Sequence, residues 1–349
     1  MTGDYSMMEP ALERMAGFGP DLRNGLTNHA PMAVEALAAL GRADAVMPWL
    51  EDYRENFLPR PRVRERIARG DWGPALGAMD RTEDWTQFFV DELKDAPWRE
   101  VLERWTARFA PGLCASATHG VIRVGHAVRS LDQAESPARI RELAEGLGYW
   151  AANYQVLPVA KGAAAALHVR DAIAQVPIVP PAERKFDGTI VSSLAALDDF
   201  PAFAPVIGLI DVSGEPAAII SDLTETFTRV YLANAHDFLT AIVFVHGVTS
   251  ATAVRSLLPH LSETTRRDAV RFAWQAGCGL YATFGTAAPP ARDIEPPRES
   301  SATLIDLAIA NGDEHAIKFT EACLREHALN PSPAYLAAAR HAIGVLVAE

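Results

Sequence analysis

Four histidine-bearing segments, spread along the chain, hold the residues best suited to chemistry. They are residues 27–31 (TNHAP), 118–123 (THGVIR), 245–249 (VHGVT) and 313–318 (DEHAIK). Each lies in or beside an apolar, helix-prone run, and none has a neighbouring cysteine that would suit a structural zinc knuckle. Imidazoles from separate helices can build one interior metal site, and imidazole suits iron, copper and zinc alike.

Helical spacing limits how the histidines combine. His119 and His126 are seven residues apart, about 10.5 Å along a helix, and His236 and His246 are ten apart, about 15 Å. Neither pair readily supplies two ligands to one ion. We therefore expect each segment to contribute one histidine to a common site.

The most specific local signal is His315 followed by Lys318, because side chains three residues apart on a helix can meet. The chain has only four lysines, at positions 94, 161, 185 and 318. A lysine ammonium has no lone pair and ligates nothing. Burial can lower its pKa, and the neutral amine can add carbon dioxide to give a carbamate oxygen ligand. The alternative is a solvated lysine paired with Glu314 or Glu321.

Each histidine also has a simpler interpretation. His119 and His246 can be hydrogen-bonded core residues, and His29 lies just before a helix start that Asn28 can cap. Gly120 and Gly247 follow two of the histidines and would let a ligand or a second helix approach closely.

Composition narrows the classes of function. The 349 residues carry a formal net charge of −12 and no basic stripe, which argues against a nucleic-acid partner. No run approaches the roughly 18 apolar residues of a membrane span, so we expect no membrane association. Three cysteines without paired spacing indicate reduced thiols and predict a cytoplasmic protein.

The elements that must position these residues are helices. We interpret residues 1–349 as a single large all-α domain. After an irregular stretch over residues 1–28, apolar periodicity and Pro or Gly boundaries predict the following helices. They cover residues 31–40, 43–56, 85–93, 98–109, 114–131, 137–151, 161–175, 216–234, 236–257, 262–284, 301–310, 313–328 and 332–347. A proline-rich excursion near 177–205 should be loops with a short helix near 192–197, and it is interpreted as a surface excursion, with a lid or a crossover as the alternatives.

Two weaker patterns occur in the sequence, a glycine motif and an internal similarity. Gly277 and Gly279 superficially match a dinucleotide fingerprint but follow a helical pattern rather than a strand, so we discount a nucleotide site there. Residues 119–131 are similar to residues 246–257. This similarity indicates either an old duplication of a helix pair or chance in an alanine-rich chain.

Taken together, the histidine segments resemble the questin oxidase-like family. The resemblance rests on residues 28–31 (NHAP), 36–41 (ALAALG), 119–123 (HGVIR), 246–250 (HGVTS) and 312–318 (GDEHAIK). Fungal members oxidatively open anthraquinone rings in aromatic polyketide pathways. Met32 and Ala33 stand where those members carry further histidines, and Arg123 replaces another, which affects the expected substrate and metal shell.

The resemblance implies an oxygenase of secondary metabolism that acts on a small aromatic substrate and dioxygen. It implies non-haem iron held by His29, His119, His246, His315 and a carboxylated Lys318, with NADPH as a candidate reductant. Lys318, His126 and Arg123 are the expected catalytic residues. Asn28, Thr249 and Asp313 are candidates for orienting the ligands.

Two other functions compete with this interpretation. The first is a helical metal-dependent hydrolase of the His-Asp type, which would use His236 and Asp237 as metal ligands and leave Lys318 unused. The second is a helical binding protein without catalytic activity. The oligomeric state does not follow from the sequence.

Overall fold

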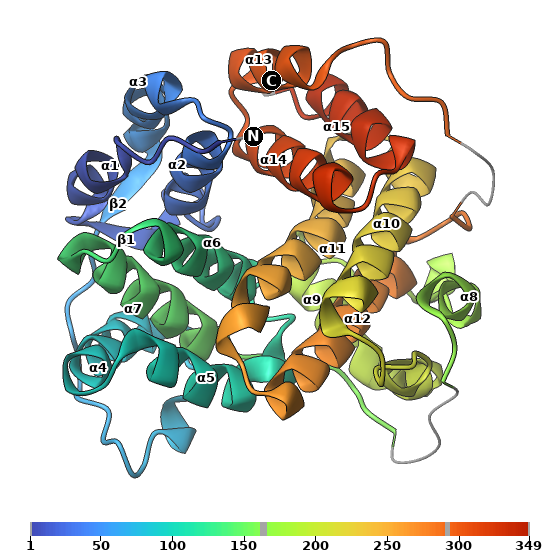
Figure 1. Ribbon diagram of the computed structural model, residues 1–349. Helices are drawn as coiled ribbons and strands as arrows, with labels where there is room; N and C mark the ends of the chain where they lie inside the picture. The colour runs from blue at the N-terminus through green and yellow to red at the C-terminus, as the bar shows by residue number, and fades with distance from the viewer. Residues whose placement is uncertain (1, 161–165, 290–293, 348–349) are drawn as a thin grey trace.

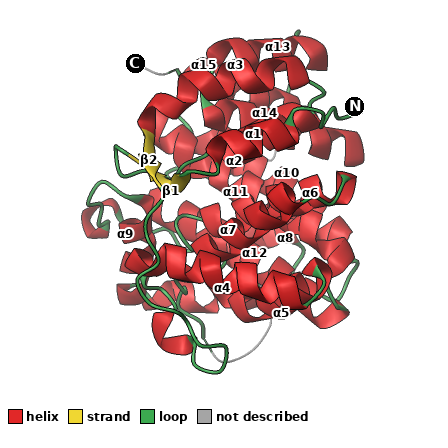
Figure 2. Ribbon diagram, turned by 90° about the vertical axis from the view of Figure 1, so that its left-hand side faces the viewer, coloured by secondary structure: helices red, strands yellow, loops and turns green. Residues whose placement is uncertain are grey.

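The computed structural model describes residues 2–160, 166–289 and 294–347, and these form a mainly α-helical protein (Figures 1 and 2). The prediction of an all-α fold is confirmed, and the one-domain interpretation stays a prediction. The first half of the chain forms α1 (Met8–Met15), β1 (Phe18–Leu22), α2 (Ala30–Ala39), α3 (Ala43–Tyr53), β2 (Phe57–Pro59), α4 (Thr82–Asp95), α5 (Trp98–Phe109), α6 (His119–Gln133) and α7 (Pro137–Ala152). The second half forms α8 (Val169–Ala172), α9 (Ile190–Ala195), α10 (Pro216–Asn234), α11 (Phe238–Leu257), α12 (Glu263–Phe284), α13 (Ser301–Asn311), α14 (Glu314–Leu329) and α15 (Pro333–Val345).

Most helices begin at a residue that caps them. Asp237 accepts a hydrogen bond from the Thr240 backbone N–H at the start of α11, and Asp313 accepts two at the start of α14. Such caps satisfy backbone donors that have no partner within the helix. Gly312 ends α13 with φ +82°, a left-handed conformation that glycine adopts without steric cost.

Four of these helices close a ring in the interior. α6 packs against α2 and α11, and α14 packs against the same two helices from the other side. In Figure 1, α11 lies near the middle, with α6 (green), α2 (blue) and α14 (red) around it. Each of these four helices carries, at its start or within it, one of the histidine-bearing segments.

The structure corrects the sequence prediction at two places. Residues 1–28 are not irregular throughout, because they contain α1 and β1, and β1 pairs with β2 as an antiparallel two-stranded sheet. The predicted helix over 161–175 is wrong in its described part: residues 169–175 form only α8 and a 3-10 turn, and residues 161–165 lie outside the described residues.

The proline-rich segment is a surface excursion in part, since residues 180–191 are mostly exposed, and it is anchored by other residues that are buried. Its short helix is present as α9, close to the predicted place. Leu194, Leu197 and Phe203 are fully buried in the main hydrophobic core. Hydrophobic burial therefore anchors this segment on the helices behind it.

α11 and its following turn are long and apolar enough to cross a membrane, which the sequence did not lead us to expect. Most of this helix is buried inside the protein, and a core helix passes the same test. The three cysteines, Cys114, Cys278 and Cys323, are buried and free. The predicted absence of a disulfide frame is confirmed, and the cytoplasmic location stays a prediction.

Candidate metal centre

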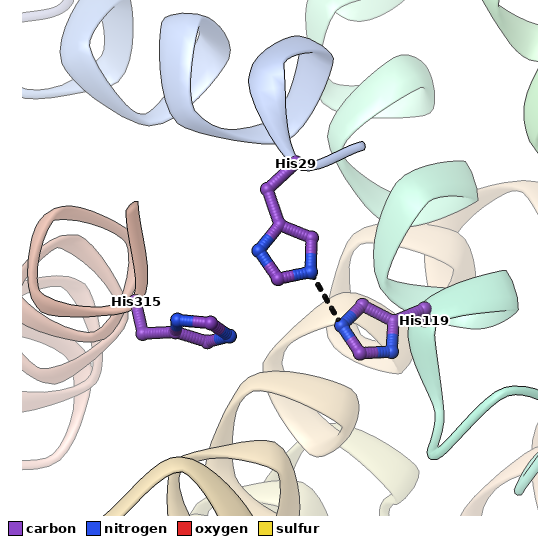
Figure 3. A group of neighbouring side chains, drawn as sticks. All are labelled: His29, His119 and His315. Atoms are coloured by element: carbon purple, nitrogen blue, oxygen red, sulfur yellow. Dashed lines mark hydrogen bonds between the residues drawn. The ribbon is translucent and has the colours of Figure 1, made fainter. Parts of the chain in front are cut away.

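Four histidines from four segments meet in the interior of the helix ring. His29 Nε2 lies 2.7 Å from His119 Nε2, which lies 3.1 Å from His246 Nε2. The ring centre of His315 is 4.5 Å from that of His29 and 5.6 Å from that of His246. Figure 3 shows His29, His119 and His315 pointing toward one another from separate helices. The structure thus brings together one histidine from each predicted segment.

Helix ends deliver three of the four rings. His29 immediately precedes α2, whose second residue is Pro31, and His119 is the first residue of α6. His315 is the second residue of α14, whereas His246 lies in the middle of α11. The cluster therefore forms where three helices start beside a fourth that passes through.

One of the two glycines that follow the histidines has a clear packing role. A Cβ on Gly120 would lie 2.8 Å from Trp150 Cγ, so glycine there allows α7 to approach α6 closely. A Cβ on Gly247 would make only ordinary contacts with Phe227, at 3.6 Å. The prediction of a close approach by a second helix is confirmed at Gly120 and is wrong at Gly247.

A left-handed turn precedes His119 and supports its ring. Ser116, Ala117 and Thr118 have φ angles of +48°, +53° and +74°, a region that residues with side chains rarely occupy. This turn places the Ser116 carbonyl oxygen 2.5 Å from His119 Nδ1. The Thr118 hydroxyl is buried without a hydrogen-bond partner. Strain of this kind persists where the surrounding structure fixes it, and it is common at functional sites.

Three of the imidazoles have their protons fixed by acceptors. The Nδ1–H of His119 donates to Ser116 O, and that of His246 donates to Ile242 O at 2.5 Å. His29 Nδ1–H donates to Glu314 Oε1 at 3.0 Å. Carbonyl and carboxylate oxygens only accept, so Nδ1 carries the proton of each neutral ring. Each Nε2 is then left with a lone pair.

These lone pairs face one another without protons between them. Burial, followed by repulsion from neighbouring basic groups, lowers the pKa of His29, His119 and His246 well below the usual 6.5. The three rings are therefore neutral at pH 7. Nε2 lone pairs at 2.7 and 3.1 Å repel unless a cation lies between them. A metal ion takes such neutral imidazole nitrogens as ligands.

His315 and its neighbours complete the polar surroundings. His315 Nδ1 is buried without a hydrogen bond, 3.6 Å from Asp313 Oδ1 and 3.8 Å from Glu314 Oε1. Glu314 Oε1 also accepts a hydrogen bond from Tyr53 at 3.4 Å. A carboxylate behind a histidine is a common arrangement around metal ligands.

Of the residues proposed from sequence to orient the ligands, Asp313 comes nearest, with its Oδ1 3.6 Å from His315 Nδ1 and no hydrogen bond between them. Asn28 caps Ala30 and donates to Gly19 O, and Thr249 donates to the carbonyl of its own helix. Neither makes a hydrogen bond to the four imidazoles. The orienting acceptors that the sequence analysis missed are Glu314, Ser116 O and Ile242 O. Glu314 adjoins His315 in sequence, but backbone carbonyls leave no sequence signal.

Lys318 is buried beside the histidines, with 4% of its surface exposed. Burial lowers its pKa from 10.5 to about 8, against the opposing pull of Glu314 and Asp313. Within residues 2–160, 166–289 and 294–347, its Nζ makes no hydrogen bond or ion pair. The alternative of a solvated lysine paired with Glu314 or Glu321 is therefore wrong.

Arg123 and His126 make no hydrogen bond or ion pair with the four histidines in the part of the chain that the structure describes. Arg123 is bound by Glu142 at 2.6 and 2.9 Å and by Glu145 at 2.9 Å. His126 lies seven residues after His119 on α6, and its Nδ1 donates to Glu35 of α2 at 2.6 Å. Their catalytic roles stay predictions.

Two cavities are candidates for a substrate site. One of about 300 Å³ is lined by Asn28 and Pro31, which flank His29, and by Arg123, one turn beyond His119. Another, of about 560 Å³, lies between the proline-rich segment and the end of α12 and is lined by Phe186, among others. Neither is lined by one of the four histidines. The smaller cavity is the better candidate for a substrate because it adjoins two of the histidine-bearing segments.

The His-Asp hydrolase interpretation finds no support in the geometry. The Asp237 carboxylate caps α11 by accepting from Thr240 at 2.8 Å, and His236 is exposed. Among the described residues, the groups with metal-ligand spacing contain neither of the two. Both residues act at the surface end of α11, eight or more residues before His246.

The buried neutral histidines predict acid lability of the metal-free protein. The unfolded chain takes up protons near pH 6.5, whereas His29, His119 and His246 do so only at lower pH. The contribution of these histidines to the free energy of unfolding is thus fully present above pH 6.5. It is lost as the pH drops below that value, by on the order of a few kcal/mol. Urea unfolding between pH 7.5 and 5 measures this. His236→Gln, at an exposed position, should leave the profile unchanged; a flat wild-type profile would contradict the prediction.

The strained turn predicts a trade between stability and ligand positioning. Thr118→Gly removes a β-branched residue from φ +74° and a buried unpaired hydroxyl. The glycine relieves the backbone strain and removes the cost of burying the hydroxyl, but it also loses the contacts of the methyl group. The net effect should raise the free energy of unfolding by about 1 kcal/mol. Metal affinity should fall about tenfold because the support of His119 loosens.

Ala166→Gly is the matched control for this variant. Ala166 has φ +51° but is exposed and makes no contact with the histidines. It should gain stability and keep its metal affinity. Chemical denaturation and metal titration of both variants decide the matter, and equal metal affinities in the two would contradict the role of the turn.

Comparison with known protein families gives a match. A family model described as Questin oxidase-like matches residues 26–323, a segment that contains the four histidines and Lys318. No curated protein matches the chain.

Proposed function

The chain belongs to the questin oxidase-like family, which makes it an oxidoreductase, and from this premise we propose that it is a non-haem iron oxygenase. The proposed substrate is an aromatic, anthraquinone-like polyketide that the enzyme oxidises or ring-opens. The proposed ligands are His29, His119, His246, His315 and a carboxylated Lys318.

The convergence of unprotonated Nε2 atoms is the observation that carries this proposal. Metal–nitrogen bonds are about 2.0–2.1 Å long, so neighbouring ligands at right angles lie roughly 3 Å apart. The two closest Nε2 pairs are 2.7 and 3.1 Å apart. The ligand atoms of His29, His119 and His315 all lie within 4.8 Å of one another, so these three suit one metal ion, and His246 lies beside them at 3.1 Å from His119.

The family and the donor set together favour iron. Zinc has no redox chemistry, whereas an enzyme that activates dioxygen at a metal ion needs a redox metal. Four imidazoles and one oxygen donor suit iron, and copper is the competing outcome of metal analysis. When bound, the metal supplies the Lewis acidity and electron transfer that dioxygen chemistry requires.

Lys318 is suited to become the oxygen ligand. A neutral Nζ attacks carbon dioxide, forms an N–C bond and releases one proton, which leaves a carbamate anion. A pKa of about 8 gives a larger neutral fraction at pH 7.5 than an ordinary lysine has. An anionic carbamate also removes the ammonium charge beside His29, which otherwise opposes cation binding.

We place the substrate in the cavity of about 300 Å³ beside His29. This volume is at the lower limit for small-molecule sites. Arg123 faces this cavity, and its Nη1 makes no hydrogen bond within the described part of the chain. Arg123 would orient a substrate oxygen through this free donor, while Glu142 and Glu145 hold the guanidinium in place. NADPH is the proposed reductant.

Metal analysis of protein made without an affinity tag tests the proposal. Iron near one per chain, together with dioxygen uptake in the presence of hydroxylated anthraquinones, is the expected result. Protein purified anaerobically without any metal, yet active, would refute the mechanism. One copper per chain would keep the site and replace the metal.

A further inference from the structure

A second buried polar cluster lies further along the same four helices, on the C-terminal side of the histidines. Its centre is the carboxylate of Glu35, which is 0% exposed. Glu35 accepts hydrogen bonds from Tyr5 at 2.5 Å, from His126 Nδ1 at 2.6 Å and from Arg129 Nε at 2.8 Å. Arg129 Nη2 also donates to Glu35. α6 is thereby joined to α2 by charged and neutral donors.

The remaining donor of Arg129 reaches the opposite side of the ring. Arg129 Nη1 donates to Glu321 Oε1 of α14 at 2.5 Å. Glu321 in turn pairs with Arg325 at 3.4 Å, and Arg325 donates to Thr252 O and Ser256 Oγ of α11. We call Glu35, His126, Arg129, Glu321 and Arg325 the Arg129 network. It touches all four helices of the ring.

The contacts of the network form a second layer across the same four helices, and the histidines form the first. On each helix a network contact lies six or seven residues beyond the histidine, at positions 29 and 35, 119 and 126, 246 and 252, and 315 and 321. At 1.5 Å per residue, the two layers are about 9 to 10.5 Å apart. Since the offset has one sign on all four, the four helices run in the same direction through both layers.

Close packing beside the network keeps this register. A Cβ on Gly125 of α6 would lie 2.7 Å from Ala253 Cα of α11, so the two backbones touch next to His126 and Thr252, at the level of the network. A displacement of one helix at the level of the Arg129 network is therefore transmitted to the histidines. Packed interiors transmit strain in this way.

We propose that Arg129 is a positioning residue that sets the separation of the histidines of α2 and α14 from His119. Its planar guanidinium fork binds Glu35 and Glu321 in directions fixed by geometry, which a lysine cannot reproduce. The proposal rests on the proposed function only in naming the ligand that the histidines hold. The spacing of the imidazoles themselves is independent of that function.

Arg129→Lys tests the proposal because it keeps the buried charge and removes the fork. Arg255→Lys is the matched control: Arg255 also binds a buried glutamate of α14, Glu326, at 2.8 and 2.6 Å, but it touches neither α2 nor α6. Two readouts are needed for both variants. They are the ¹⁵N-histidine spectrum of the metal-free protein and the affinity for Fe²⁺.

Arg129→Lys should shift the imidazole resonances of the cluster and weaken Fe²⁺ binding about tenfold. Arg255→Lys should leave both readouts at their wild-type values, whatever its effect on unfolding. Unchanged spectra in Arg129→Lys, or equal shifts in both variants, would overturn the positioning role. If wild-type protein bound no metal, the proposed function would fail while the imidazole spectra still decided this inference.

Discussion

Lys318→Ala is expected to lower the oxygenase activity by about 100-fold or more, which is the upper range for loss of a residue that tunes a metal site. The lysine is buried, makes no hydrogen bond or ion pair among the described residues and has a pKa lowered to about 8. A carbamate on its Nζ would supply the only anionic ligand. Steady-state dioxygen uptake on iron-loaded protein measures the loss.

Chemical rescue separates a carbamate from other roles of this lysine. Acetate or propionate should restore part of the activity of Lys318→Ala by filling the vacated space with a carboxylate. ¹³C-bicarbonate should give a carbamate resonance in wild-type protein and none in the variant. Lys185→Ala is the control, because Lys185 is exposed and paired with Asp199 at 2.6 Å. A fully active, iron-replete Lys318→Ala protein would refute the role.

His119→Ala is expected to abolish metal binding, because His119 is the imidazole that lies closest to two others. Its Nε2 is 2.7 Å from that of His29 and 3.1 Å from that of His246. Iron content should fall from about one per chain to below about a tenth, since each ligand contributes a large part of the affinity. Metal analysis after dialysis against a weak chelator measures this.

Unfolding experiments give an independent readout of the same variant. A metal present at about 1,000 times its dissociation constant stabilises the wild-type protein by about 4 kcal/mol. His119→Ala should show no such difference between metal-loaded and metal-free samples. His341→Gln, remote on α15 and bound to Tyr231, should keep the full difference. Metal-dependent stabilisation of His119→Ala would contradict the central place of this ligand.

Much of the helical fold could be predicted because the chain marks its helix boundaries. α10 begins at Pro216 and ends at Asn234, as its periodicity and proline predict. The failures have a physical cause. α1 lies among glycine and proline residues and is stabilised by packing against α2 and α7, a tertiary effect that local propensity does not contain.

The site could be predicted in its residue types but not in its supports. Spacing along helices showed that His119 and His126 belong to different places, and the structure separates them into two layers. The left-handed turn at 116–118 could not be predicted, because serine, alanine and threonine seldom adopt it. Acceptors such as Ile242 O belong to the backbone, which every residue type carries.

The distribution of the ligands along the chain also sets the order of events during synthesis. A ribosome that has completed α12 has made His29, His119 and His246, but neither His315 nor Lys318. Such a nascent chain offers three imidazoles without the helix that closes the ring, and these would bind the proposed metal only weakly. Loading of the proposed metal would therefore follow the docking of α14 and would serve as a checkpoint for completed folding.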